Sequence, residues 1–86
     1  MIKHAVAREP ELAGKVFSGE DGVKYEGERF IQINDDSMPT GFLTTAVNYR
    51  HGKLHGCPAI SYPDGLEEEW KDGNFVRVKA LPYAER

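Results

Sequence analysis

The sequence predicts an all-β domain, an antiparallel meander of consecutive hairpins (a repeat sheet) preceded by a short arm. Two observations predict it. Apolar and polar residues alternate with period two along most of the chain after residue 15, and glycine-containing turn dipeptides separate these alternating segments. An apolar stripe with helical spacing does not run for three turns anywhere, so helix is a minor component. With 86 residues the chain forms one domain with a thin core.

The first fourteen residues differ from the rest and are interpreted as an N-terminal arm. Glu9–Leu12 has the composition of a single helical turn, because Pro10 suits the first helical position and Gly14 follows as a stop. A turn of this length is not stable alone. The predicted organisation is therefore an arm over residues 1–14 and a single antiparallel β domain over residues 15–86.

The first predicted strand is Val23–Asn34, in which odd positions are mostly apolar and even positions mostly polar. Phe30 breaks this alternation because it lies on the polar side. Gly27 predicts a bulge or bend within the strand. The turn-rich segment 35–41 then ends it.

Further strands are predicted at residues 42–50, 57–62, 66–71 and 74–80. His51-Gly52 and Asp72-Gly73 are predicted to be two-residue hairpin connections, because their glycines can adopt a positive φ. Pro58 argues for an edge position or a bulge in its strand. Each strand should bury one face: Leu43, Thr45, Val47 and Tyr49 share one side of 42–50, and Leu66, Glu68 and Trp70 share one side of 66–71, opposite Glu67, Glu69 and Lys71.

An internal repeat supports the hairpin prediction. An aromatic residue followed three positions later by glycine occurs at Tyr49–Gly52 and again 21 residues later at Trp70–Gly73. Asp-Gly pairs at 21–22 and 64–65 recur after 43 residues, close to two such periods. A single hairpin cannot bury enough apolar area to be stable, so consecutive hairpins should add into one sheet.

These motifs resemble a known family. Tyr-x-x-Gly-Lys-Leu-His-Gly (49–56), Tyr-Pro-Asp-Gly (62–65) and Glu-Glu-Trp-Lys-Asp-Gly (68–73) resemble a MORN repeat, and Asp-Gly-Val-Lys-Tyr-Glu-Gly-Glu (21–28) is similar to the same consensus. The resemblance is closest to bacterial MORN-variant proteins, many of which are described as antitoxins. It implies a sheet that serves as a scaffold for protein–protein contacts and, in some eukaryotic members, for lipid head groups. It implies no catalytic residue, because the family motif contains none.

Charge and composition exclude several classes of function. The formal net charge is −3, and Lys and Arg are scattered singly, which disfavours a nucleic-acid binder. No apolar run reaches the length of a signal peptide or a membrane span. A single cysteine rules out an internal disulfide framework. From these features we expect a cytoplasmic protein, and the resemblance to MORN-variant proteins implies a bacterial or phage origin.

A metal or catalytic site is the least favoured hypothesis. His51, His55 and Cys57 lie within seven residues and, with His4 as a fourth donor, have the residue types of a zinc site. However, His-x-x-x-His shares a face only on a helix, and the glycines around it argue against one. Cys57 has no activating base nearby in sequence. The carboxylates of residues 64–72 would need a cleft for acid–base chemistry. We therefore predict no metal, no cofactor and no catalytic residue.

The favoured hypothesis is a non-enzymatic interaction module that binds, and by binding inhibits, a partner protein with a basic surface. An acidic sheet face would steer the partner. The aromatic residues Tyr25, Tyr49, Tyr62, Trp70 and Phe75 are first of all expected to form the core of the repeats. If one sheet face stays partly open, they would instead provide affinity, with Trp70 as the best candidate for an anchor. The alternative is a structural sheet protein that forms a homodimer. The predicted binding residues are Trp70, Glu67, Glu69, Asp64, Tyr49 and Tyr25. With the further carboxylates of the chain, the acidic surface could extend along one sheet face: Glu20, Asp21, Glu26, Glu28, Asp35 and Asp36.

Overall fold

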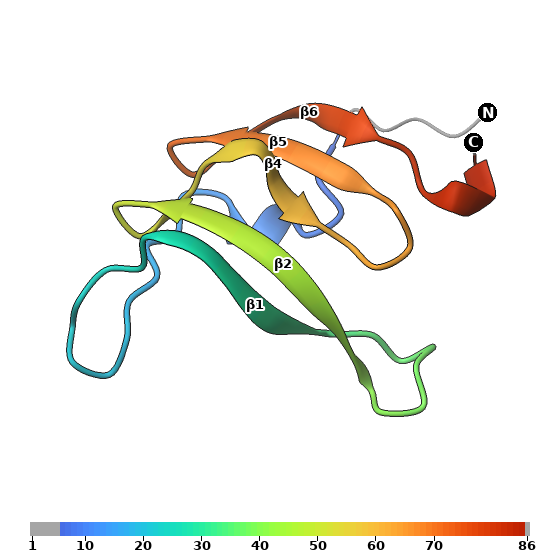
Figure 1. The fold of residues 1–86 in the computed structure, drawn as a ribbon, viewed down its shortest axis with the longest axis horizontal. Coiled ribbons are helices and arrows are strands. Elements are labelled where there is room, and N and C mark those ends of the chain that lie inside the picture. Colours follow the sequence, from blue (N-terminus) through green and yellow to red (C-terminus); the bar gives the residue numbers. More distant parts are fainter. Residues whose placement is uncertain (1–5, 86) are drawn as a thin grey trace.

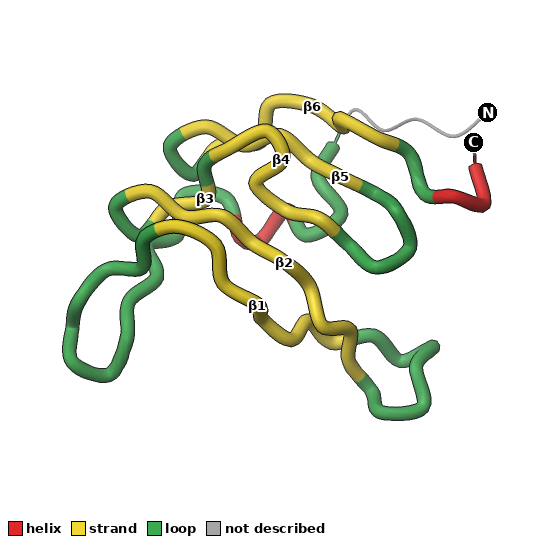
Figure 2. Tube along the Cα trace, viewed as in Figure 1, coloured by secondary structure: helices red, strands yellow, loops and turns green. Residues whose placement is uncertain are grey.

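The computed structural model describes residues 6–85, and its strands form one antiparallel sheet in the order β1-β2-β4-β5-β6, with β3 pairing β2 (Figures 1 and 2). The predicted all-β meander is confirmed. Residues 1–5 of the predicted arm, and residue 86, lie outside the described part. No helix within residues 6–85 is long and apolar enough to cross a membrane. The elements are η1 (Pro10–Leu12), β1 (Gly27–Asn34), β2 (Phe42–Arg50), β3 (Lys53–Leu54), β4 (Gly56–Ser61), β5 (Glu67–Lys71), β6 (Asn74–Ala80) and η2 (Tyr83–Glu85).

The β1–β2 hairpin is the longest pairing in the sheet. Its register runs without a shift from Gly27 opposite Tyr49 to Asn34 opposite Phe42. The strand predicted at 23–34 begins only at Gly27, whose φ of 75° bends the chain there. β4 pairs with β2 only at positions 46 and 47. The end of the β1–β2 hairpin that carries the turn 35–41 therefore extends beyond the rest of the sheet (Figure 1).

One face of the sheet is covered and the other is open. Val47, Ile60, Glu68 and Val78 lie directly opposite one another on β2, β4, β5 and β6, so their side chains share a face. The segment before β1, blue in Figure 1, passes behind this face, where Ala7 is buried. We call this side the covered face and the other the open face. The core consists of Ala7, Val47, Tyr49, Leu54, Ala59, Ile60, Tyr62, Leu66 and Trp70, with Leu12, Phe17 and Tyr25 among the residues packed against it.

The two predicted turn dipeptides form two-residue connections of the same geometry. His51 and Gly52 have φ of 54° and 78°, and Asp72 and Gly73 have φ of 49° and 85°. Two consecutive residues with positive φ give the turn whose twist matches that of antiparallel strands. The aromatic residue two positions before each turn is buried on the covered face. The 21-residue sequence repeat is thus a repeat of local structure.

Each turn glycine also holds a segment from earlier in the chain. Its N–H donates to one backbone carbonyl, and its own carbonyl accepts from another backbone N–H. The four bonds are Gly52 N to Tyr25 O (2.9 Å), Phe17 N to Gly52 O (2.7 Å), Gly73 N to Leu54 O (2.8 Å) and Gly14 N to Gly73 O (2.9 Å). The turns therefore tie the N-terminal segment to the covered face.

Pro58 lies in an interior strand, which corrects the expectation of an edge position. β4 lies between β2 and β5, and its register against β5 shifts between Gly56 and Ile60. The alternative expectation of a bulge is confirmed. A proline fits there because an irregular stretch of the ladder does not require the N–H that proline lacks.

Alanine substitutions at the two turn glycines should differ in cost. A Cβ at Gly52 would lie 2.8 Å from the Phe17 carbonyl oxygen, whereas at Gly73 its nearest neighbour is the Lys53 side chain at 3.6 Å. Both positions carry the left-handed penalty of roughly 1–2 kcal/mol. We expect Gly73→Ala to reduce the free energy of unfolding by about 1 kcal/mol, and Gly52→Ala by about 3 kcal/mol because the backbone clash adds to it. Urea unfolding measures both, and equal losses would contradict this account.

Candidate functional site

Trp70 and Tyr49 belong to the core, as first expected of the aromatic residues, and the alternative of an exposed anchor at Trp70 is wrong. The Trp70 side chain is on the covered face, and only 1% of the residue is exposed. Its ring lies edge-on to Phe75 at 5.8 Å, and the Tyr49 ring lies 5.2 Å from that of Tyr25. The N-terminal segment closes this face, so neither aromatic presents a surface to a partner. Tyr25 is half-buried at the rim.

Glu68 is a fully buried carboxylate on the same face. It accepts hydrogen bonds from the Trp70 indole Nε1 (3.1 Å) and from the backbone N–H of Arg8 (2.8 Å). The Arg8 guanidinium bonds Asp64 at 2.8 Å and lies 4.4 Å from the centre of the Tyr62 ring. Burial raises the pKa of the Tyr62 hydroxyl. Asp64 and Glu68 therefore attach the N-terminal arm to the sheet.

Glu67 and Glu69 are on the open face, as predicted, but both lie beside cations of β6. Glu69 forms an ion pair with Arg77 at 2.7 Å, and Glu67 lies 3.8 Å from Lys79. Their charges are thus locally compensated. The acidic face expected along β5 is therefore paired with cations of the neighbouring strand β6 and does not carry uncompensated charge at Glu67 and Glu69.

The negative charge of the chain instead gathers along β1 and the loops at its two ends. Residues 20–36 contain six of the fourteen acidic residues and two of the eleven basic ones, a net charge of −4, so the remainder of the chain carries +1. One of the two cations, Arg29, lies over the Tyr25 ring at 3.9 Å. We call this region the acidic edge; its carboxylates are Glu20, Asp21, Glu26, Glu28, Asp35 and Asp36.

β1 is an edge strand with outward-pointing backbone groups. Asp35 N donates to Gly41 O at 2.8 Å, which continues the β1–β2 register by one position. In an antiparallel pair the bonded residues alternate, so odd residues of β1 bond to β2 and even residues point away. Glu28, Phe30 and Gln32 therefore direct their N–H and C=O groups outward. No described strand lies beyond them.

Phe30 is the most exposed large apolar residue on this edge, at 70%. It lies on the open face opposite Ala46. Phe30 and Gln32 were not among the binding residues predicted from the sequence. The signal that identifies Phe30 is its break in the alternation of the strand, an apolar residue at a solvent-facing position.

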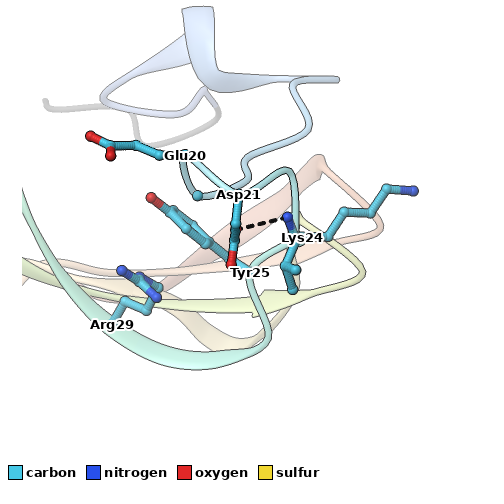
Figure 3. Close-up of a pocket in the computed structure, with 7 residues that line it drawn as sticks. Glu20, Asp21, Lys24, Tyr25 and Arg29 are labelled. Atoms are coloured by element: carbon cyan, nitrogen blue, oxygen red, sulfur yellow. Dashed lines mark hydrogen bonds between the residues drawn. The ribbon is translucent and has the colours of Figure 1, made fainter.

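A polar hollow of about 450 Å³ lies at the beginning of β1 (Figure 3). The Tyr25 and Arg29 side chains lie next to each other at its wall, and Asp21 accepts a hydrogen bond from Val23 N at 3.0 Å. Its lining carries two carboxylates, Glu20 and Asp21, and two cations, Lys24 and Arg29, so its formal charges balance. Its lining residues are Gly19, Glu20, Asp21, Val23, Lys24, Tyr25 and Arg29.

A second hollow, of about 280 Å³, lies between β1 and the η1 turn. Its apolar walls come from the covered-face side of β1 and from the N-terminal segment, and its acidic rim is Glu9 and Glu11. Burial, the hydrogen bond to Glu11 and the charge of Glu11 raise the pKa of Glu9 to about 7. The lining residues are Glu9, Glu11, Leu12, Phe17, Ile31, Gln32, Ile33 and Asn34.

The residues of the zinc hypothesis are not brought together. His51 Nδ1 lies 3.1 Å from Glu26, and His55 Nδ1 lies 3.6 Å from Asp72. Cys57 is exposed, with Arg77 Nη2 at 3.8 Å. Among residues 6–85 no group of three His, Cys, Asp or Glu side chains could hold a metal ion. His4 lies outside the described residues.

No protein-family model matches the chain, and neither a curated protein nor a solved structure matches it.

Removing the Glu68 carboxylate should destabilise the fold far more than removing that of its neighbour. Glu68→Ala leaves the Trp70 indole N–H and the Arg8 N–H without their acceptor, and we expect a loss of about 3 kcal/mol. Glu69→Ala on the opposite face removes one exposed ion pair and should cost under about 1 kcal/mol. Urea unfolding followed by tryptophan fluorescence measures both, and similar losses would refute the role of Glu68.

The attachment of the arm should weaken between pH 4.5 and pH 7. The pKa of Glu9 in the folded state, about 7, lies above the ordinary 4.5, so protonated Glu9 favours the folded arm. That contribution is complete below pH 4.5 and is lost as the pH rises through 7. The pKa of Glu11 shifts downward through its hydrogen bond with Glu9, so its contribution is present above pH 4.5 and is lost on acidification.

NMR titration of the side-chain carboxyl carbons tests this, together with amide exchange of residues 7–12 at pH 5 and pH 8. We expect Glu9 to titrate near pH 7 and exchange in the arm to accelerate, beyond the intrinsic pH effect, at the higher pH. Glu9→Gln should remove that extra acceleration. A Glu9 midpoint near its ordinary 4.5 would disprove the assignment.

Proposed function

We propose that this chain is a small, non-enzymatic protein-binding module of MORN type that binds, and thereby inhibits, a partner protein with a basic surface. The observation that carries the proposal is the segregation of charge: a net −4 along the acidic edge against +1 for the remainder of the chain. Such a field raises the encounter rate with a cationic partner and disfavours anionic ones. The same sign of charge disfavours nucleic acids as partners.

The acidic edge also offers the contacts that convert encounter into affinity. Phe30 supplies an exposed aromatic surface among the carboxylates, the composition typical of an interface anchor with a polar rim. Of the binding residues predicted from the sequence, Tyr25 lies at this edge. The proposed binding surface is thus on β1 and not on β5. Its chemistry is the one predicted from the sequence: carboxylates around an aromatic side chain.

The MORN-type assignment rests on the internal repeat. Both aromatic–x–x–Gly units form the same turn, and in both the turn glycine bonds an earlier segment through its N–H and its carbonyl. In a repeat sheet of this type, one hairpin unit recurs and each copy is expected to bond to the segment that precedes it in the chain.

The homodimer alternative is disfavoured by the same charges. Two copies paired antiparallel through β1 about Phe30 would bring Glu28 opposite Gln32 and the 20–28 carboxylates of one copy near Asp35 and Asp36 of the other. Like charges in such positions oppose pairing. The proposal therefore expects a monomer of 9.7 kDa by light scattering.

Charge reversal on the acidic edge should abolish partner binding. The immobilised chain is used to capture its partner from host extract, and the affinity of the purified partner is then measured by calorimetry at low and physiological salt. Glu28→Lys combined with Asp36→Lys should weaken binding by about tenfold or more and flatten its salt dependence. Glu67→Lys with Glu69→Lys makes the same change of net charge on β5 and serves as the control.

Circular dichroism verifies that both double variants fold. A stronger loss in the β5 control than in the acidic-edge variant would return the binding surface to β5. A chain that is dimeric at the concentrations used for calorimetry would favour the homodimer instead.

A further inference from the structure

The two edges of the sheet differ in how well they can receive another strand. The pairing of β6 with β5 shifts register twice, and β6 carries Arg77 and Lys79. Bulges and cations of this kind are devices by which proteins block edge pairing. β1 pairs with β2 over eight residues without a shift and contains no proline, and its one cation, Arg29, lies opposite Val47 and over the Tyr25 ring. The regular backbone of β1 therefore makes it the edge that can pair with a further strand.

The outward backbone groups of β1 define where an added strand would bond. Glu28, Phe30 and Gln32 alternate with the residues that bond to β2, so they present their N–H and C=O groups at a regular spacing along the edge. An extended peptide that bonds to such a row adds a strand to the sheet. Main-chain bonds then give affinity whatever the peptide sequence, and side-chain contacts give specificity.

The side chains of an added strand would meet two different surfaces. On the open face one set would lie beside Phe30. On the other face the second set would pass along the hollow walled by Leu12 and Ile31, with Glu9 and Glu11 at its rim. Apolar walls below carboxylates suit lysine or arginine, whose aliphatic stem packs against apolar groups while the cationic head bonds an acid.

We propose that β1 binds an extended segment of the partner protein as an additional strand, and that this segment alternates apolar residues with lysine or arginine. The apolar residues contact Phe30 on the open face, and the cations enter the hollow below Glu9 and Glu11. This inference rests on the proposed function and specifies its mode of binding and the chemistry of the bound segment.

A second copy of the chain does not fit this position. Pairing of β1 with β1 brings the acidic edges together, as described above. The basic edge of a second copy, β6, is irregular in its register, and its Arg77 and Lys79 already lie beside Glu69 and Glu67. The occupant is therefore a segment of another protein.

A proline substitution at one position tests the main-chain bonds between β1 and the added strand. Gln32 lies on the outward row, so Gln32→Pro removes the N–H offered to the added strand without removing a bond to β2. Gln32→Ala is the matched control, because it removes the same side chain and keeps the N–H. The probe is a synthetic peptide of alternating lysine and valine that is long enough to span β1, titrated into the full chain labelled with ¹⁵N.

Wild type and Gln32→Ala should bind the peptide with similar affinity, and Gln32→Pro should bind it about tenfold more weakly, a loss consistent with one or two backbone bonds. Binding should slow amide exchange at Phe30 and Gln32 in the wild type. A peptide with methylated backbone nitrogens should fail to bind the unmodified protein, which tests the same bonds without altering the fold. Replacing lysine by glutamate in the peptide should also abolish binding.

Equal affinities of the proline and alanine variants, or binding of the methylated peptide, would overturn strand addition. In that event the proposed function still stands or falls on the charge-reversal experiment with the captured partner. Absence of peptide binding by the wild type at low salt would overturn the inference too. Failure of the charge-reversal experiment itself would remove the proposed function and the inference together.

Discussion

The turn glycines at positions 52 and 73 are the constraint on which the architecture depends. Each has a left-handed φ that the tight hairpin requires, and each uses both of its backbone polar groups to hold a segment from earlier in the chain. At Gly52 the Phe17 carbonyl approaches so closely that no side chain fits. The same two glycines that allow the tight turns thus also bond the N-terminal segment, at Phe17, Tyr25 and Gly14, against the covered face.

A sheet covered on one face must treat its two faces differently. On the covered face even a carboxylate is acceptable, because Glu68 receives hydrogen bonds from Trp70 and from the Arg8 backbone when the arm closes over it. On the open face carboxylates remain near water and are matched by cations one strand away, as Glu69 is by Arg77. Most of the apolar surface is thus used for the core, and binding has to rely on what remains at the edges.

The sequence predicted what depends on neighbouring residues and missed what depends on distant ones. Period-two alternation identified the buried sides of the strands, and the dipeptides at 51–52 and 72–73 identified the turns, because both are local properties of the chain. Alternation placed Trp70 on one side of its strand with Leu66 and Glu68, but the segment that covers this side was not predictable, because its bond from Arg8 to Glu68 spans 60 positions. The cations beside the β5 carboxylates likewise come from cross-strand register. The start of β1 was placed four residues early because Gly27 was interpreted as a bulge within the strand, whereas its positive φ marks the beginning of the strand.

The candidate site on β1 departs from two general patterns of stable sheets: polar side chains at solvent-facing positions, and irregular edge strands that resist pairing. Phe30 occupies a solvent-facing position where alternation predicts a polar residue. β1 lacks the register shifts of β6, and its one cation, Arg29, lies over the Tyr25 ring. Neither feature improves the stability of the chain alone, and both are hazards for aggregation unless something restrains them. The acidic edge is such a restraint, because like charges keep copies of β1 apart. In the proposed binding mode the same charges would attract a cationic strand, so one arrangement of carboxylates would both oppose self-pairing and favour the partner. An edge that was only protected would need no exposed aromatic, and an edge that was only adhesive would need no charge; β1 has both.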